Sequence, residues 1–113
     1  MISDALAAAT LRREFTDAAV WLALHDADPR DGATELPVPR QWAVFAEPVG
    51  REVSLAERPI WDPMPAARVT HWSAWDAVDG GGVKWTGRFE RPITVAAGDG
   101  FRIPEGSLTL YFE

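Results

Sequence analysis

Three aspartates lie close together after residue 25, and their spacing is the first feature that could bind a ligand. Asp26, Asp28 and Asp31 follow His25, and Gly32 would allow a tight turn. Carboxylate oxygens at such spacing suit Ca²⁺. The spacing is not that of an EF-hand loop, however, and Asp-Pro and Asp-Gly are common turn sequences in which the carboxylate bonds to nearby backbone. We therefore predict a polar turn here and no metal site.

The two histidines, His25 and His71, could orient a metal ion or act as a general base. Each lies in a segment with the alternation of a strand, and no serine stands in a nucleophile motif. Ser73, for example, is flanked by Trp72 and Ala74. We expect each imidazole to fix a strand end or a loop by a hydrogen bond. The sequence predicts no catalytic residue and no enzyme, since a small hydrolase would need a cleft that holds one histidine beside a carboxylate.

Three consecutive glycines at 80–82 resemble a phosphate-binding loop only in composition. Such a loop needs a helix start directly after it, to supply backbone N–H groups. Here the segment Val83-Lys-Trp-Thr86 has the composition of a strand. We predict a hairpin turn at the glycines and no cofactor.

Six tryptophans are too many for the centre of so small a core, so some must face outward. They are Trp21, Trp42, Trp61, Trp72, Trp75 and Trp85. Exposed tryptophans on a sheet can contact another protein, or can stack on sugar rings as in a carbohydrate-binding module. The protein interface is favoured because it is the more general use of tryptophan. Trp72 and Trp75 are three residues apart in a strand, so they face opposite sides.

A partner-binding surface is expected in the proline-rich region 35–65, which includes Trp61, and on one of Trp72 or Trp75. Rigid extended backbone and large amphipathic rings gain contact area at low entropic cost. The residues expected to contact a partner are Pro37, Pro39, Trp61, Pro63, Trp72 and Trp75.

One helix is expected, at residues 3–15. Ser3 can cap its N-terminus, and Asp4 suits the positive end of the helix dipole. Leu11 and Phe15 are four residues apart, so they share one face of the helix. Because a helix this short is only marginally stable alone, we expect that face to pack against the rest of the protein.

From residue 18 onward the pattern is that of short strands. Alternation of apolar residues, bounded by proline and glycine turns about ten residues apart, is typical of an all-β sandwich or barrel. The expected strands are 20–25, 41–47, 52–56, 58–61, 68–75, 83–89, 93–96, 101–103 and 108–113. We predict a mainly β fold, a single jelly-roll-like β-sandwich over residues 18–113 with one short N-terminal helix. The whole chain, 1–113, is expected to be one domain.

Composition excludes several classes of function. The net charge is −6, and Lys84 is the only lysine, which argues against nucleic-acid binding. The chain has no cysteine, so disulfides and thiolate metal sites are excluded. It has no apolar run of about 20 residues, which predicts that it does not enter a membrane. The acidic, Ala-rich start lacks the basic region of a signal peptide, and we expect an intracellular protein.

An ordered series of short motifs gives the chain a resemblance to small virion proteins of tailed bacteriophages. That group comprises tail-fibre-like, minor tail and capsid decoration proteins. After an Ala-rich first helix, the motifs are Trp21-Leu-Ala-Leu-His-Asp-Ala-Asp-Pro29, Arg40-Gln41, Val69-Thr-His71, Trp75-Asp-Ala77, Gly80-Gly81, Ala97-Gly-Asp99 and Gly106-Ser-Leu-Thr-Leu110.

The resemblance spans almost the whole chain but departs from the family pattern at two places. Ser73 stands where a glycine is common, and the first loop is Glu35-Leu-Pro-Val-Pro39 rather than Gly-rich. The resemblance implies a non-enzymatic structural protein of the virion, assembled in the host cytoplasm, that binds capsid or tail subunits. It is also compatible with a homo-oligomer such as a trimer. The alternative is a carbohydrate-binding module that recognises a glycan of the host surface.

Overall fold

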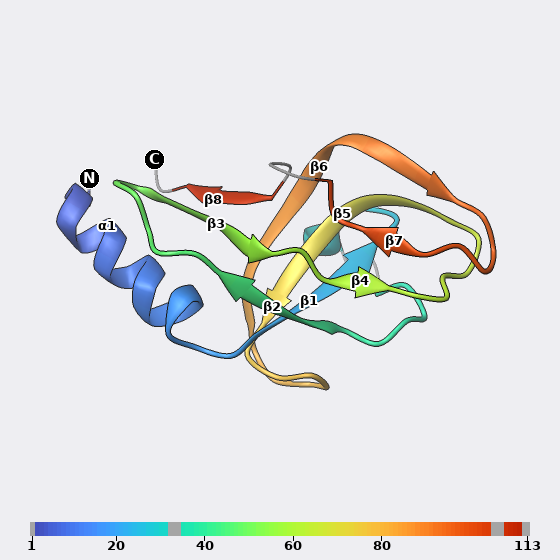
Figure 1. Ribbon diagram of the computed structural model, residues 1–113, viewed down its shortest axis with the longest axis horizontal. Coiled ribbons are helices and arrows are strands. Elements are labelled where there is room, and N and C mark those ends of the chain that lie inside the picture. The colour runs from blue at the N-terminus through green and yellow to red at the C-terminus, as the bar shows by residue number, and fades with distance from the viewer. Residues whose placement is uncertain (1, 32–34, 105–107, 112–113) are drawn as a thin grey trace.

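The computed structural model describes residues 2–31, 35–104 and 108–111, and most of them belong to antiparallel strands (Figure 1). The elements in chain order are α1 (Asp4–Leu11), η1 (Arg12–Thr16), β1 (Val20–His25), η2 (Pro29–Asp31), β2 (Gln41–Phe45), β3 (Glu52–Glu57), β4 (Ile60–Trp61), β5 (Ala67–Trp75), β6 (Val83–Val95), β7 (Phe101–Arg102) and β8 (Thr109–Tyr111).

Six of the strands form one curled sheet, in the order β6-β5-β1-β2-β3-β8, with neighbours antiparallel. The strands β4 and β7 pair separately as a two-stranded ribbon. Figure 1 shows the curled sheet and the ribbon, with α1 at one end. The predicted fold class is confirmed: the protein is mainly β, sandwich-like, with one short N-terminal helix.

The helix begins at a side-chain cap and docks on the sheet by its last turns. Ser3 Oγ accepts a hydrogen bond of 3.1 Å from the backbone N–H of Leu6. After Leu11 the chain continues through one wider π-helical turn, η1. The turn places Phe15 edge-on against Phe45 of β2, with ring centroids 5.2 Å apart. No helix in the described part of the chain is long and apolar enough to cross a membrane.

The core lies on one side of the curled sheet, which we call the inner face. In β1 the inner face carries Val20, Leu22 and Leu24, all essentially buried. Leu22 pairs with Ala74 of β5, and Leu24 pairs with Trp72. The opposite side of the sheet, the outer face, carries Trp21, Ala23 and His25 from β1. The larger buried residues of the core are Leu11, Phe15, Leu22, Leu24, Phe45, Trp61, Trp72, Phe89, Phe101, Ile103 and Leu110.

The strand β6 differs from the prediction because it is continuous where two strands were expected. Its register with β5 shifts between His71↔Arg88 and Val69↔Ile93, so that extra residues on β6 bulge out. Pro92, expected to break the strand, lies inside it. A proline cannot donate to a neighbouring strand, and β6 tolerates it because it is an edge strand of the sheet.

The last strand is described only at 109–111, which lies within the predicted 108–113. Phe112 and the first two residues of the last family motif, Gly106 and Ser107, lie outside the described residues.

The hairpin between β5 and β6 forms at the predicted glycine-rich turn. Gly80 and Gly81 have φ of 64° and 75°, the left-handed region that favours glycine. Gly82 N–H donates to Asp76 Oδ1 at 2.8 Å and fixes the base of the turn. The turn is therefore held by side-chain as well as backbone bonds.

The ring of Trp72 lies directly over Gly87 of the neighbouring strand. A Cβ built on Gly87 would stand 2.5 Å from Trp72 Cζ2, which is closer than any real contact. We expect Gly87→Ala to lower the free energy of unfolding by about 1–3 kcal/mol, because the buried ring has no space to shift. The measurement is urea unfolding followed by tryptophan fluorescence.

Gly100→Ala is the matched control for that substitution. A Cβ at Gly100 meets Asp62 at 3.5 Å, an ordinary contact distance. Equal losses of stability in the two variants would contradict the close packing of Trp72 on Gly87.

Candidate functional site

Two of the tryptophans expected at a partner surface are part of the core instead. Trp61 is 1% exposed, its ring packs 5.9 Å from that of Phe101, and its Nε1–H donates to the carbonyl of Pro39 at 3.0 Å. Trp72 is 3% exposed and covers Gly87. The surface of the single chain therefore offers neither ring to a partner. The reason is the pairing of β4 with β7, which turns Trp61 inward.

The other expected contact residues are accessible. Pro37, Pro39 and Pro63 are exposed, and Trp75 is half-buried. Trp72 and Trp75 face opposite sides of β5, as their spacing predicts, and Trp75 is the one on the outer face. A contact between these four residues and a partner stays a prediction.

Cross-strand pairing brings three tryptophans side by side on the outer face. Trp21 of β1 pairs with Trp42 of β2 on one side and with Trp75 of β5 on the other. Residues that pair directly across antiparallel strands share a face and have neighbouring Cβ atoms. We call Trp42, Trp21 and Trp75 the tryptophan row. Trp42, at its β2 end, is 61% exposed, whereas the other two are half-buried.

Reasoning from the sequence missed Trp42 as a surface residue. The signal that could have found it is the alternation in β2, where Ala43 and Phe45 are buried on one face and Trp42 points to the other. Alternation alone does not show which of the two sets of side chains in β2 faces the core. Since several of the six tryptophans had to be buried, Trp42 could have belonged to either set.

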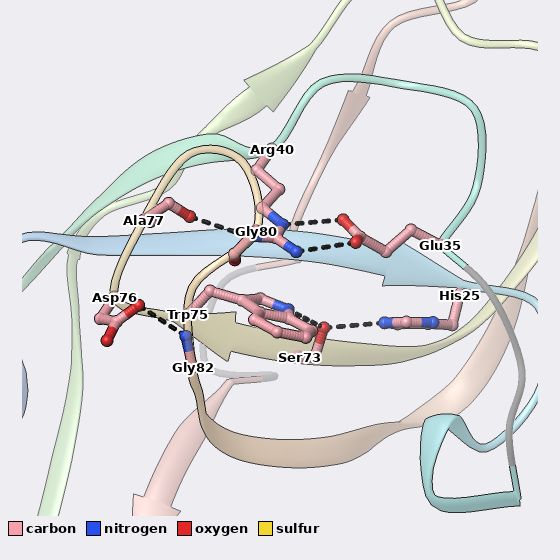
Figure 2. A network of polar contacts seen from close by, with 9 residues as sticks. All are labelled: His25, Glu35, Arg40, Ser73, Trp75, Asp76, Ala77, Gly80 and Gly82. Carbon is pink, nitrogen blue, oxygen red and sulfur yellow. Dashed lines mark hydrogen bonds and ion pairs between the residues drawn. The ribbon is translucent and has the colours of Figure 1, made fainter.

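The guanidinium of Arg40 lies over the Trp75 end of the tryptophan row, 3.9 Å from the ring centroid. It makes two parallel hydrogen bonds of 2.8 Å to the carboxylate of Glu35. It also donates to the carbonyls of Ala77 and Gly80 at 2.9 and 2.7 Å. Figure 2 shows these bonds joining the loop before β2 to the β5–β6 hairpin. Arg40 is 8% exposed, so it is a structural residue of the outer face.

The ion pair changes the acid–base behaviour of both partners. The pKa of Glu35 lies below its ordinary value, first because Arg40 donates hydrogen bonds to the carboxylate. The pKa of Arg40 is raised, first by its hydrogen bonds to Glu35. Both groups are thus held in their charged forms.

A second polar chain runs beside the first on the outer face (Figure 2). Trp75 Nε1–H donates to Ser73 Oγ at 2.7 Å, and Ser73 Oγ lies 2.8 Å from His25 Nε2. A serine beside a histidine is the arrangement of a nucleophile and its base. Here, however, Ser73 is fully buried and its oxygen already accepts a bond from the indole. The contact fixes the end of β1 against β5, the role expected of His25.

One of the aspartates after β1, Asp28, is bound by an arginine. Arg30 donates to Asp28 from its backbone N–H, its Nε and its Nη2, the last at 2.8 Å from Oδ2. These bonds lower the pKa of Asp28 to about 2. Within residues 2–31, 35–104 and 108–111, no three His, Asp or Glu side chains converge as metal ligands do. The side chain of Asp31 lies outside this description.

Replacing Arg40 by alanine would leave Glu35 without its partner and two carbonyls without donors. We expect Arg40→Ala to lower the free energy of unfolding by about 2–4 kcal/mol, because the remaining groups are partly buried and lose their bonds. Denaturant unfolding at pH 7 measures the loss. The control, Arg102→Ala, removes an exposed arginine and should cost at most about 0.5 kcal/mol. A cost that small for Arg40→Ala would overturn the structural role of its guanidinium.

The lowered pKa of Glu35 predicts an acid-sensitive contribution to stability. A carboxylate whose pKa is lower in the folded state stabilises the protein above its unfolded pKa, about 4.3 for glutamate. That contribution is lost as pH falls below this value and through the folded pKa. Denaturant unfolding at a series of pH values below 5 should therefore show a steeper decline for the wild type than for Glu35→Gln. The pH dependence that comes from Asp28 is the same in the wild type and in Glu35→Gln, so it cancels in the comparison. Parallel declines would show that Glu35 is not stabilised by Arg40.

Comparison with known proteins agrees with the family resemblance. A protein-family model, that of the podophage GP4 fiber I protein gp80, matches residues 2–111. No curated protein matches the chain. The matched segment takes in α1 and every strand, and so includes the tryptophan row and the bonds of Arg40. The chain belongs to the family of the podophage GP4 fiber I protein gp80 and is a fibre-type structural component of the phage virion.

Proposed function

We propose that this chain is a non-enzymatic minor component of the phage tail that docks on another virion protein through the tryptophan row. The observation that carries the proposal is the exposure of Trp42, 61%, at the end of three tryptophans aligned across neighbouring strands. Tryptophan is the residue type most enriched among those that dominate binding energy at protein interfaces.

The row is suited to binding because its Trp75 end is held in place before a partner arrives. Trp75 is fixed by its bond to Ser73 and by the guanidinium of Arg40. Trp21 stands between two paired strands. A rigid aromatic surface loses little conformational entropy on association, so more of the contact energy remains as affinity.

A position on the tail is supported by the family name, which is that of a fibre protein. Capsid decoration, the other role compatible with the resemblance, would instead distribute the chain over the head. The resemblance also supports contacts between copies of this chain, in a homo-oligomer such as a trimer. The exposed prolines, Pro37, Pro39 and Pro63, would then extend the contact surface beyond the row.

Carbohydrate binding by the tryptophans is the less favoured alternative. A sugar platform needs two or more coplanar exposed rings with polar groups beside them. Trp42 is mostly exposed, but Trp21 and Trp75 are half-buried, and Arg40 covers one face of Trp75. The row therefore resembles the centre of a protein interface more than a sugar-stacking surface.

Incorporation of variants into particles tests the docking surface. Trp42→Ala should leave the fold of the free chain intact and reduce the copies found in purified particles about tenfold or more, because a central aromatic contact is lost. Quantitative mass spectrometry of the particles gives the copy number. Tyr111→Ala is the matched control, since Tyr111 is 54% exposed on β8, away from the row.

Trp61→Ala, in contrast, should destabilise the free chain by about 3–5 kcal/mol.

Wild-type incorporation of Trp42→Ala would refute the tryptophan row as the docking surface. Gold-labelled antibody and electron microscopy decide the location: label on tails supports the proposal, and label spread over heads replaces it with capsid decoration. Retention of the wild type on a glycan array, lost in Trp42→Ala, would instead support the carbohydrate-binding alternative.

A further inference from the structure

A small polar cavity opens at the other end of the outer face, away from the tryptophan row. It has a volume of about 230 Å³ and is lined by Asp28, Arg30, His71, Thr86, Gly87 and Arg88. His71 and Arg88 pair across β5 and β6, and η2 brings Arg30 to the same place. His71 is four residues from Trp75 along β5, roughly 13 Å at the rise of a strand.

Three side chains of this cavity have hydrogen-bonding capacity that no described residue uses. The guanidinium of Arg88 makes no hydrogen bond or ion pair with any described residue. His71 Nδ1 lies 2.8 Å from the hydroxyl of Thr70, which leaves Nε2 for another partner. The hydroxyl of Thr86, in register with Ser73, adds a third group on the same face.

The charge of the cavity has the opposite sign to that of the whole chain. The lining holds two guanidiniums and one carboxylate, a formal charge of +1 with histidine neutral, whereas the chain carries −6. The carboxylate of Asp28 is already bound by Arg30. It therefore neutralises Arg30 and leaves Arg88 as the charge that a ligand would meet.

We propose that this cavity binds a single oxyanion, a carboxylate or a phosphate, on a ligand no larger than one sugar ring. Arg88 pairs with the anion, and His71 Nε2 and the Thr86 hydroxyl complete its hydrogen bonds. Guanidinium groups bind both oxyanions well because their N–H fork matches two oxygens. The volume lies below the 300–1,000 Å³ or so of sites for drug-sized ligands, which sets the limit on size.

Hydrolysis is the other chemistry that a histidine beside a carboxylate could perform. In this cavity Asp28 is bound by Arg30 and His71 Nδ1 by Thr70, so the carboxylate does not orient the imidazole. Ser73, fully buried, is not part of the lining. The arrangement supports binding of an anion rather than its turnover.

Titration of the ¹⁵N-labelled full chain with sodium phosphate, glucuronate and glucose, at constant ionic strength, tests the proposal. The amides of Gly87 and Arg88 and the ring of His71 are the reporters. We expect saturable shifts with phosphate or glucuronate and none with glucose. No saturable shift with either anion, or an equal response to glucose, would overturn the proposal.

Two arginine variants make the test specific. Arg88→Gln should weaken anion binding about tenfold or more, since it removes the unpaired charge. Arg91→Gln removes an exposed arginine of the same strand that does not line the cavity, and should bind as the wild type does. Equal affinity in the wild type and Arg88→Gln, or equal weakening in both variants, would refute the site. Trp42→Ala should leave the titration unchanged, so the docking proposal and the anion site fail independently.

Discussion

The outer face of this protein depends on one buried guanidinium. Arg40 joins segments that are far apart in the chain: Glu35 in the loop before β2, Trp75 at the end of β5, and the carbonyls of the hairpin that follows. The planar guanidinium has five N–H donors, and here it contacts four acceptor oxygens and the face of one ring. A lysine ammonium, with three donors and no planar face, could not make all of these contacts. The loop, the hairpin and the tryptophan row therefore keep their positions together.

The two faces of the sheet are held by different kinds of interaction. The inner face buries aliphatic and aromatic side chains from both halves of the chain. The outer face carries the polar bonds of Arg40 and Ser73, with the tryptophan row at one end and the basic cavity at the other. Because side chains alternate along each strand, a substitution on one face leaves the other largely unchanged. A virion protein can thus vary its contacts without losing its core.

Alternation and turn residues located most of the strands, and β1 begins and ends where its Val20-Trp-Leu-Ala-Leu-His25 pattern does. They did not predict that β6 is continuous. The tryptophans show where such reasoning ends. Trp61 was expected at the surface because a large ring on rigid, proline-rich backbone suits an interface, but pairing with β7 places it in the core. The bonds of Arg40 link residues up to 40 positions apart, and the cavity combines η2 with β5 and β6. Both depend on contacts between segments that are distant in the chain, which local pattern does not encode.

The bulge and the proline of β6 have a consequence for how the open edge of the sheet can pair with strands of other molecules. An uninterrupted edge strand of 13 residues would expose a row of free N–H and C=O groups, with which a strand of another molecule could pair. The shift in register bends β6 midway, and Pro92 removes one donor there. The bulge and the proline therefore hinder the addition of further strands to this edge. Association with another protein would then depend on side-chain contacts, which are specific to the partner.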